Sequence, residues 1–290
     1  MKLFASACGP VVLAAALGLI APAAGLAAAP APAAGSAYAP SDWKRIDPEN
    51  LMVIDTSKGR VIVEFRPEFT AEHVARVKEL TREGFYDGLQ FFRVIDTFMA
   101  QTGDKANTGA GESGKSDLKA AFNFRRGPEV AYSSMPNPKG GLFGFVGPNP
   151  VYSQPDGLAL MTADGKVKSW GLFCYGVAGM ARTGQPDSAS SQFFLMRQNF
   201  PRLDDDYTPW GRVVVGTEVV RALTIGEPPP TPDTMLKVRI AADIPAAERP
   251  DVWRVDTMSA AFRARMAAVL AARGTDFTPC DVEVPAEVRR

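Results

Sequence analysis

The sequence predicts a mainly β fold, either a barrel or a sandwich. Short β-branched and aromatic runs are separated by closely spaced turn residues, and only two or three segments have a helical pattern. The chain has 290 residues, 46% of them apolar or aromatic. That length and composition suffice for one sizeable core with appendages.

The first elements are a strand pair and a helix. Residues 51–54 and 61–65 are β-branched runs on either side of a turn at 56–59, which predicts a hairpin. Residues 70–83 have apolar side chains at helical spacing, and Gly84 ends the helix.

The later elements are less regular. Residues 89–99 predict one strand, 102–116 a loop, and 126–170 a Pro- and Gly-rich irregular insertion. Further strands are predicted at 171–177, 192–196, 211–215 and 235–240, and helices at 218–223 and 256–272.

The charges argue against several function classes. Acidic and basic residues balance at 32 each, so no basic surface favours nucleic acid. His73 is the single histidine, which disfavours a histidine-based metal cluster or a Ser-His-Asp site, and it is expected to be a surface or packing residue. Residues 204–206 are three aspartates that predict a solvated turn. We expect no metal and no cofactor.

The N-terminus resembles a secretory signal peptide over residues 1–29. Lys2 precedes an apolar run at 11–20, and Ala27-Ala28-Ala29 forms a cleavage pattern. The alternative is an uncleaved anchor, although the run is short and Pro22 interrupts it. Residues 30–50 predict a linker and N-terminal extension. We therefore expect an exported, periplasmic protein with no stable membrane insertion after cleavage.

Two cysteines, Cys174 and Cys280, lie beyond the signal segment, whereas Cys8 lies inside it. An exported pair favours a disulfide. The alternative is two unpaired thiols, one of them buried in a strand, because the sequence alone does not place them within bonding distance.

The most informative block is 91–104, FFRVIDTFMAQTGD. It is followed in order by GMAR at 179–182, SSQFF at 190–194 and LDDDYTPWGRV at 203–213. These blocks resemble the signature of the cyclophilin-type peptidyl-prolyl cis-trans isomerases, here of a bacterial, exported kind. The resemblance covers about 51–244, with the insertion at about 126–170, and leaves 245–290 as a C-terminal helical extension.

That resemblance implies a closed eight-stranded antiparallel β-barrel capped by two helices, with a groove for an X-Pro segment on its outer face. Rotation about the X-Pro amide faces a barrier of about 18–20 kcal/mol. No bond must break, so the enzyme needs only to favour the twisted amide, whose nitrogen accepts a hydrogen bond from a guanidinium.

By resemblance, Arg93 is the catalytic residue, and Gln101 orients it or holds the substrate backbone. The remaining candidate residues bind the substrate: an apolar cup for the proline ring, and groups that hold the peptide chain. The cup is expected to contain Phe98, Met99, Phe194 and Leu203, with Tyr207 at a wall position of the pocket. The peptide-binding groups are expected to be the backbone of Ala181 and Arg182 and the side chain of Gln192.

Some positions depart from the family pattern. Phe92 replaces a common His, Arg182 replaces Asn and brings a charge, and Tyr207 replaces His. Arg202 stands where cyclosporin-sensitive relatives carry Trp, which predicts weak cyclosporin binding.

We therefore expect a monomeric isomerase that acts on unfolded or partly folded exported proteins and peptides containing X-Pro. The alternatives are a proline-peptide-binding module or holdase chaperone without significant turnover, and a scaffold that docks onto an envelope assembly through its insertion and C-terminal segment.

Overall fold

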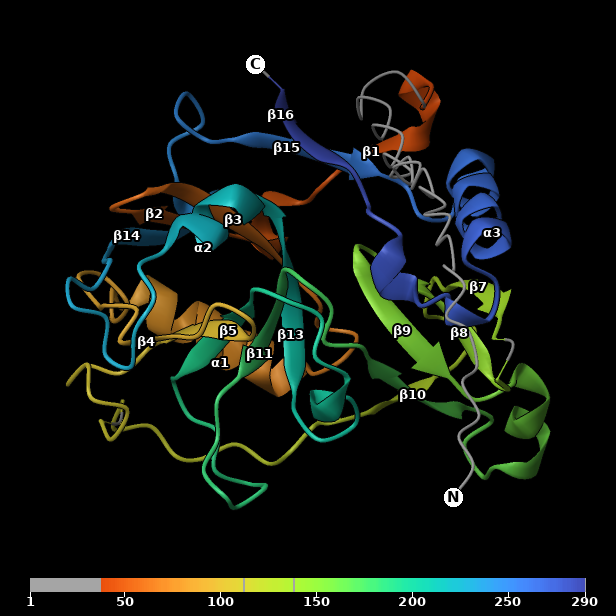
Figure 1. The fold of residues 1–290 in the computed structure, drawn as a ribbon, viewed down its shortest axis with the longest axis horizontal. Coiled ribbons are helices and arrows are strands. Elements are labelled where there is room, and N and C mark those ends of the chain that lie inside the picture. The colour runs from red at the N-terminus through yellow and green to blue at the C-terminus, as the bar shows by residue number, and fades with distance from the viewer. Residues whose placement is uncertain (1–37, 112, 138, 290) are drawn as a thin grey trace, which may run out of the picture. The chain divides into compact units, whose positions relative to one another are not determined.

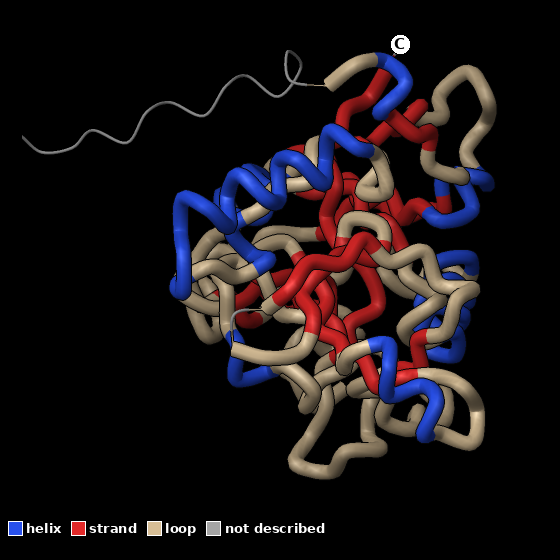
Figure 2. Tube along the Cα trace, turned by 90° about the vertical axis from the view of Figure 1, so that its right-hand side faces the viewer, coloured by secondary structure: helices blue, strands red, loops and turns tan. Residues whose placement is uncertain are grey.

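The computed structural model describes residues 38–111, 113–137 and 139–289, which belong to one compact unit. The predicted signal peptide with its cleavage pattern, Cys8 and the first part of the predicted linker lie outside these residues. Strands fill the centre of the view in Figure 2, and helices lie around them. Across the described ranges, no helix is both long and apolar enough to cross a membrane.

The main sheet is antiparallel and curled (Figure 1). Its eight strands, in spatial order, are β14 (Met235–Ile240), β2 (Leu51–Thr56), β3 (Gly59–Phe65), β13 (Pro209–Val215), β11 (Val177–Met180), β12 (Phe193–Met196), β5 (Met99–Thr102) and β4 (Arg93–Val94). No ladder of hydrogen bonds joins β4 to β14 among the described residues, so the sheet forms a half-barrel and the predicted closure is not confirmed.

The predicted hairpin and helix are confirmed. Thr56 pairs with Gly59 at the end of β2 and β3, which leaves a two-residue turn. Helix α1 (Ala71–Arg82) buries Val74, Val77 and Leu80 against the sheet, and Gly84, with φ +69°, follows its end.

His73 is a buried member of the same helix. Its ring nitrogen Nδ1 lies 2.6 Å from the Thr70 hydroxyl, and burial lowers the pKa of the imidazole to about 4. His73 is therefore a packing residue rather than a surface one.

The core of the half-barrel is aromatic. Trp210 packs on Phe65 and Phe193 with ring centroids 5.5 and 5.4 Å apart, and Tyr86 meets Phe193 edge-on at 5.4 Å. Helix α2 (Thr217–Ala222) packs against β3 and buries Val220. Because this core is closely packed, the strands of the main sheet form a rigid support for the side chains that they carry.

The single strand predicted over 89–99 is wrong. Two short strands, β4 and β5, are separated by a turn in which the N–H of Phe98 donates to Ile95 and the N–H of Ile95 donates to Met99. Asp96, in this turn, pairs with the buried guanidinium of Arg197 at 2.9 Å. The break places Arg93 and Gln101 side by side on neighbouring strands.

The insertion is a second antiparallel sheet, so the prediction of an irregular, loop-rich segment is also wrong. Gly147 and Pro148 form the two-residue turn of a hairpin, and Gly144 lies where a Cβ would come 2.3 Å from the Ser133 carbonyl oxygen. Glycine and proline sit inside these strands rather than ending them. The spatial order is β6 (Phe124–Arg126), β10 (Val167–Gly171), β9 (Asn149–Ser153), β8 (Leu142–Val146) and β7 (Ser133–Pro136).

The C-terminal extension is helical only in part. Helix α3 (Ala260–Arg273) is present, capped by Ser259 and ended at Gly274, but two strands flank it. These two strands form a third sheet with a strand from residues 30–50, the segment predicted to be a linker and N-terminal extension. Its spatial order is β1 (Trp43–Arg45), β15 (Asp251–Val255) and β16 (Ala286–Arg289).

Short 3₁₀ turns complete the secondary structure. They are η1 (Pro40–Asp42), η2 (Pro48–Asn50), η3 (Asp156–Met161), η4 (Pro201–Leu203), η5 (Ala241–Asp243), η6 (Gly274–Asp276) and η7 (Pro279–Asp281).

The extension is fixed to the rest of the unit by apolar, ionic and covalent contacts. Phe262 of α3 meets Phe145 of the insertion edge-on at 5.2 Å. Arg254 of β15 donates to the buried carboxylate of Glu64 at 2.9 Å. Cys174 and Cys280 form a disulfide with Cα atoms 5.2 Å apart, which answers the question that the sequence leaves open.

Candidate active site

Arg93 and two glutamines form a continuous chain of side chains across three neighbouring segments. Arg93 on β4 is the register partner of Gln101 on β5, and its Nη1 donates to the Gln101 Oε1 at 3.3 Å. The Gln101 Nε2 donates in turn to the Gln192 Oε1 at 3.0 Å, just before β12. Arg93 remains 39% exposed, so its guanidinium is fixed at the surface and reachable by a ligand.

The loop that follows β5 forms one wall of a groove. The Asp104 carboxylate accepts N–H donors from Ala106, Thr108 and Gly109 at 2.8, 2.8 and 2.6 Å. Burial raises the pKa of Asp104, but these backbone hydrogen bonds outweigh it and hold the pKa below its usual range. The Gln192 Nε2 donates to the Gly109 carbonyl at 3.1 Å, so the loop and the glutamine chain are linked.

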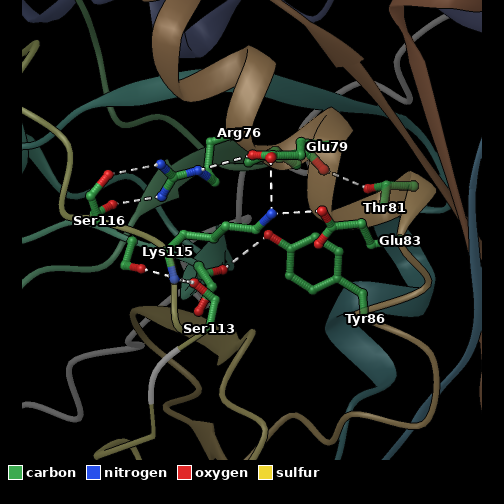
Figure 3. A network of polar contacts seen from close by, with 11 residues as sticks. Arg76, Glu79, Thr81, Glu83, Tyr86, Ser113, Lys115 and Ser116 are labelled. Atoms are coloured by element: carbon green, nitrogen blue, oxygen red, sulfur yellow. Dashed lines mark hydrogen bonds and ion pairs between the residues drawn. The ribbon is translucent and has the colours of Figure 1, made fainter.

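A polar network holds the same loop to helix α1 (Figure 3). Lys115 donates to Glu79 and Glu83 at 2.9 and 2.6 Å, and these hydrogen bonds raise the pKa of Lys115. Arg76 donates to the Ser116 carbonyl at 2.7 Å. Helix α1 therefore holds the loop in place through these side-chain contacts.

The hollow beside this wall has a volume of about 190 Å³. Four predicted residues line it, namely Gln101, Ala181, Arg182 and Gln192, together with the loop at Gly109 and Gly111.

The predicted apolar residues gather in one cluster. Met99, Phe194 and Leu203 are buried, and Phe98 and Tyr207 are half-buried at its edge. The Phe194 and Tyr207 ring centroids lie 6.0 Å apart and meet edge-on. Because Phe98 and Tyr207 are half-buried, part of this aromatic cluster is accessible to a small apolar ring such as that of proline.

Sequence reasoning missed other aromatic members of this cluster, among them Phe173 and Phe200. Phe173 lies 5.8 Å from Phe194 and 6.4 Å from Tyr207, and Phe200 lies 4.4 Å from Phe98, between ring centroids. Phe173 precedes the disulfide-bonded Cys174, which belongs to the same cluster. Neither Phe173 nor Phe200 belongs to one of the motifs that identify the site, so the sequence around them does not indicate their position.

The Ala181–Arg182 backbone is partly committed to the sheet. The Ala181 N–H donates to the Gln192 carbonyl at 2.9 Å. The Ala181 carbonyl and the Arg182 N–H have no hydrogen-bond partner among the described residues, so they can pair with a peptide. Of the polar groups of this backbone, the Ala181 carbonyl and the Arg182 N–H are therefore the two that are available for the predicted binding of a peptide.

The Arg182 charge, which stands where relatives carry Asn, is neutralised within the protein. Its guanidinium lies 4.3 Å from the Tyr207 ring centroid and donates to the Asp206 carboxylate at 2.9 Å. Because the Arg182 charge is paired in this way, it should influence the enzyme's preference for charged substrates less than an unpaired arginine would.

The neighbouring aspartates at 204–206 form a turn, as predicted, with Asp206 exposed and Asp204 and Asp205 half-buried. Each also has a partner within the protein. Asp204 accepts from the Phe173 N–H at 2.7 Å, and burial raises its pKa to about 6. Asp205 pairs with Lys168 at 2.5 Å. In the parts of the chain that the structure describes, no group of three or more acidic, His or Cys side chains is arranged to hold a metal ion.

Residues 51–242 match a family model described as cyclophilin type peptidyl-prolyl cis-trans isomerase/CLD. The chain belongs to the cyclophilin family. Its enzyme class is that of the peptidyl-prolyl cis-trans isomerases, which act on proline-containing peptides and proteins.

Curated relatives agree with this membership. A probable peptidyl-prolyl cis-trans isomerase of Brucella abortus is 32% identical over 213 residues, which is 68% of this cyclophilin and 85% of the relative. A peptidyl-prolyl cis-trans isomerase of Schizosaccharomyces pombe is 27% identical over 170 residues, covering 59% of this chain and 82% of the relative.

A solved structure extends the similarity beyond the family domain. The cyclophilin AquaCyp293 from Hirschia baltica is 35% identical with a TM-score of 0.76, and the match covers 86% of this chain and 94% of that one. The match thus includes more of the chain than residues 51–242.

Proposed function

We propose that this cyclophilin accelerates X-Pro isomerisation in exported proteins by stabilising the twisted amide with Arg93. The single observation that carries the proposal is the placement of a surface-exposed guanidinium, held by Gln101, beside the apolar cluster. Arg93 and Gln101 are paired on β4 and β5, and Phe194 is the register partner of Gln101 on β12.

Rotation about the X-Pro bond requires only a hydrogen-bond donor placed beside the proline nitrogen. When the C–N bond of an X-Pro amide twists, its resonance is lost and the lone pair becomes localised on the proline nitrogen, where it can accept a hydrogen bond. A fixed guanidinium donates to that nitrogen more strongly in the twisted state than in the planar state, which lowers the barrier. The apolar cluster holds the proline ring while the preceding residue rotates.

Export is supported by two features. The N-terminal segment has the order of a signal peptide, with a cleavage pattern at Ala27-Ala28-Ala29. The Cys174–Cys280 disulfide is typical of proteins from oxidising compartments. We therefore place the enzyme in the periplasm as a monomer, with proline-containing exported chains as substrates.

The test is a protease-coupled or NMR-exchange assay on X-Pro peptides with wild type, Arg93→Ala and Arg93→Lys. We expect Arg93→Ala to lower kcat/KM by about 10²–10³-fold, as for loss of one transition-state donor. Arg93→Lys also loses most activity, because an ammonium lacks the planar fork. Arg60→Ala, which removes an exposed arginine paired with Asp55 on β2, is the matched control and retains full activity.

Two results would contradict the proposal in different ways. Full activity in a folded Arg93→Ala variant shows that another group stabilises the twisted amide. No acceleration by folded wild type across several residues before proline shows that the groove is a binding or holdase site without turnover. Localisation is checked separately by fractionating cells that express the full chain.

A further inference from the structure

Arg93 has a second partner that no sequence motif indicates. Its Nε donates to the Glu227 Oε2 at 2.5 Å, across 134 residues of sequence. Val94 and Gly226 form an antiparallel bridge with hydrogen bonds of 2.8 and 2.9 Å, which places Arg93 and Glu227 directly opposite each other. Opposite charges in that position attract each other.

The loop that carries Glu227 is held firmly in place. The buried Asp233 carboxylate accepts from the Thr224 N–H and the Ser57 hydroxyl, both at 2.7 Å. Gly226 has φ +155°, and a Cβ there would lie 2.4 Å from the Pro229 Cα, so the tight bend requires glycine. Glu227 therefore meets Arg93 from a fixed backbone rather than from a free loop.

The two partners of Arg93 use opposite parts of the guanidinium. Nε donates to Glu227, and Nη1 donates to Gln101 at 3.3 Å. Nη2 makes no hydrogen bond to any described residue. Because two contacts define the plane of a rigid fork, they fix the direction in which the remaining donors point.

Glu227 also lines a hollow beside Arg93. The hollow has a volume of about 550 Å³, and Phe92 and Asn107 form part of its wall. At 50% exposure, the carboxylate is in reach of a bound peptide. With Glu227 present, the ion pair presents no net charge to that hollow; without it, Arg93 presents a full positive charge.

We propose that Glu227 is a positioning residue, which orients the Arg93 guanidinium and neutralises it, so that the enzyme accepts acidic and basic residues next to proline about equally. This rests on the role of Arg93 proposed above. Glu227 touches Arg93 rather than the reacting amide, so it acts through that residue.

The experiment compares Glu227→Gln, Glu227→Ala and Glu227→Asp on paired peptides with Glu or Lys beside the proline. Glu227→Gln keeps an oxygen that accepts from Nε but loses the charge. We expect its kcat to stay within about threefold, while the kcat/KM ratio shifts toward the Glu peptide by about three- to tenfold, as for one unit charge a few ångströms away. Added salt reduces that shift.

Glu227→Ala loses both the charge and the acceptor. We expect the same shift in peptide preference together with an approximately tenfold fall in kcat at little-changed KM, and Glu227→Asp restores the charge balance. The control is Glu248→Gln, an exposed carboxylate in a separate hollow, which changes neither quantity. Circular dichroism and urea midpoints confirm that each variant is folded.

The outcomes separate the two proposals. If Arg93→Ala is inactive but the Glu227 variants keep wild-type kcat and peptide preference, this inference is overturned and the role of Arg93 stands. If folded Arg93→Ala keeps full activity, the role of Arg93 fails and the inference fails with it.

Discussion

The Cys174–Cys280 disulfide should supply a large part of the stability of this cyclophilin. It joins residues 106 apart in sequence, and the chain-entropy treatment assigns a cross-link of that span about 5 kcal/mol at 25 °C. A typical domain has a total unfolding free energy of about 5–15 kcal/mol. Cys280→Ala is the cleaner perturbation, because Cys280 is only partly buried whereas Cys174 is fully buried.

The assay is urea unfolding of the purified protein, with and without reductant. For a urea dependence of about 3 kcal/mol per molar, the loss of about 5 kcal/mol moves the midpoint down by about 1.7 M. Reductant should lower the wild-type midpoint to that of Cys280→Ala and leave the variant unmoved. The double variant Cys174→Ala/Cys280→Ala should lose little more than either single one.

A specific result would refute this reasoning. If Cys280→Ala unfolds within about 0.3 M urea of wild type under oxidising conditions, the bond contributes little to the unfolding free energy. A wild-type midpoint that is insensitive to reductant, with two thiols that react with a labelling reagent in the native protein, would mean that the bond does not form.

Three further predictions concern stability and the groove wall. Because burial lowers the pKa of His73 to about 4 and the unfolded value is near 6.5, the wild type should lose about 2.5 kcal/mol relative to His73→Gln as pH falls from 7 to 4.5; parallel urea titrations that show no such difference would contradict this. Gly103→Ala places a Cβ 2.5 Å from the Ser191 carbonyl oxygen at φ +89°, so it should cost about 2–3 kcal/mol and lower kcat/KM, and unaltered melting and turnover would argue against it. Glu64→Gln leaves the buried Arg254 without its carboxylate and should cost about 3–5 kcal/mol by chemical denaturation, whereas a loss below 1 kcal/mol would show that water or another anion replaces it.

Local signals were sufficient for much of the half-barrel. Alternating runs and a two-residue turn predicted β2 and β3, and helical spacing with a terminal glycine predicted α1. The insertion was mispredicted because Pro136, Gly144 and Pro150 lie inside its strands, where local rules treat such residues as breaks. The third sheet was missed because β1 has only three residues and its partner is about 200 residues away.

Part of the candidate site could be predicted from local motifs, and part of it depends on contacts between distant segments. The ordered motifs located Arg93, Gln101 and the apolar residues, and the structure brings them together. Glu227 was missed because the Gly-Glu-Pro-Pro-Pro run indicates only a helix end. Its contact with Arg93 depends on a bridge between Val94 and Gly226, and no local pattern encodes a pairing over that distance.

The pairing of the N-terminal strands sets the order in which this chain can finish folding during synthesis. β1 pairs with β15, and β2 pairs with β14, so both wait for residues made near the end of translation. Until then their edges are open to pairing with other chains. The strands that carry Arg93, Gln101 and Phe194 are all made earlier, so the segments of the groove emerge before β1 has a partner and before β14 covers the free edge of β2.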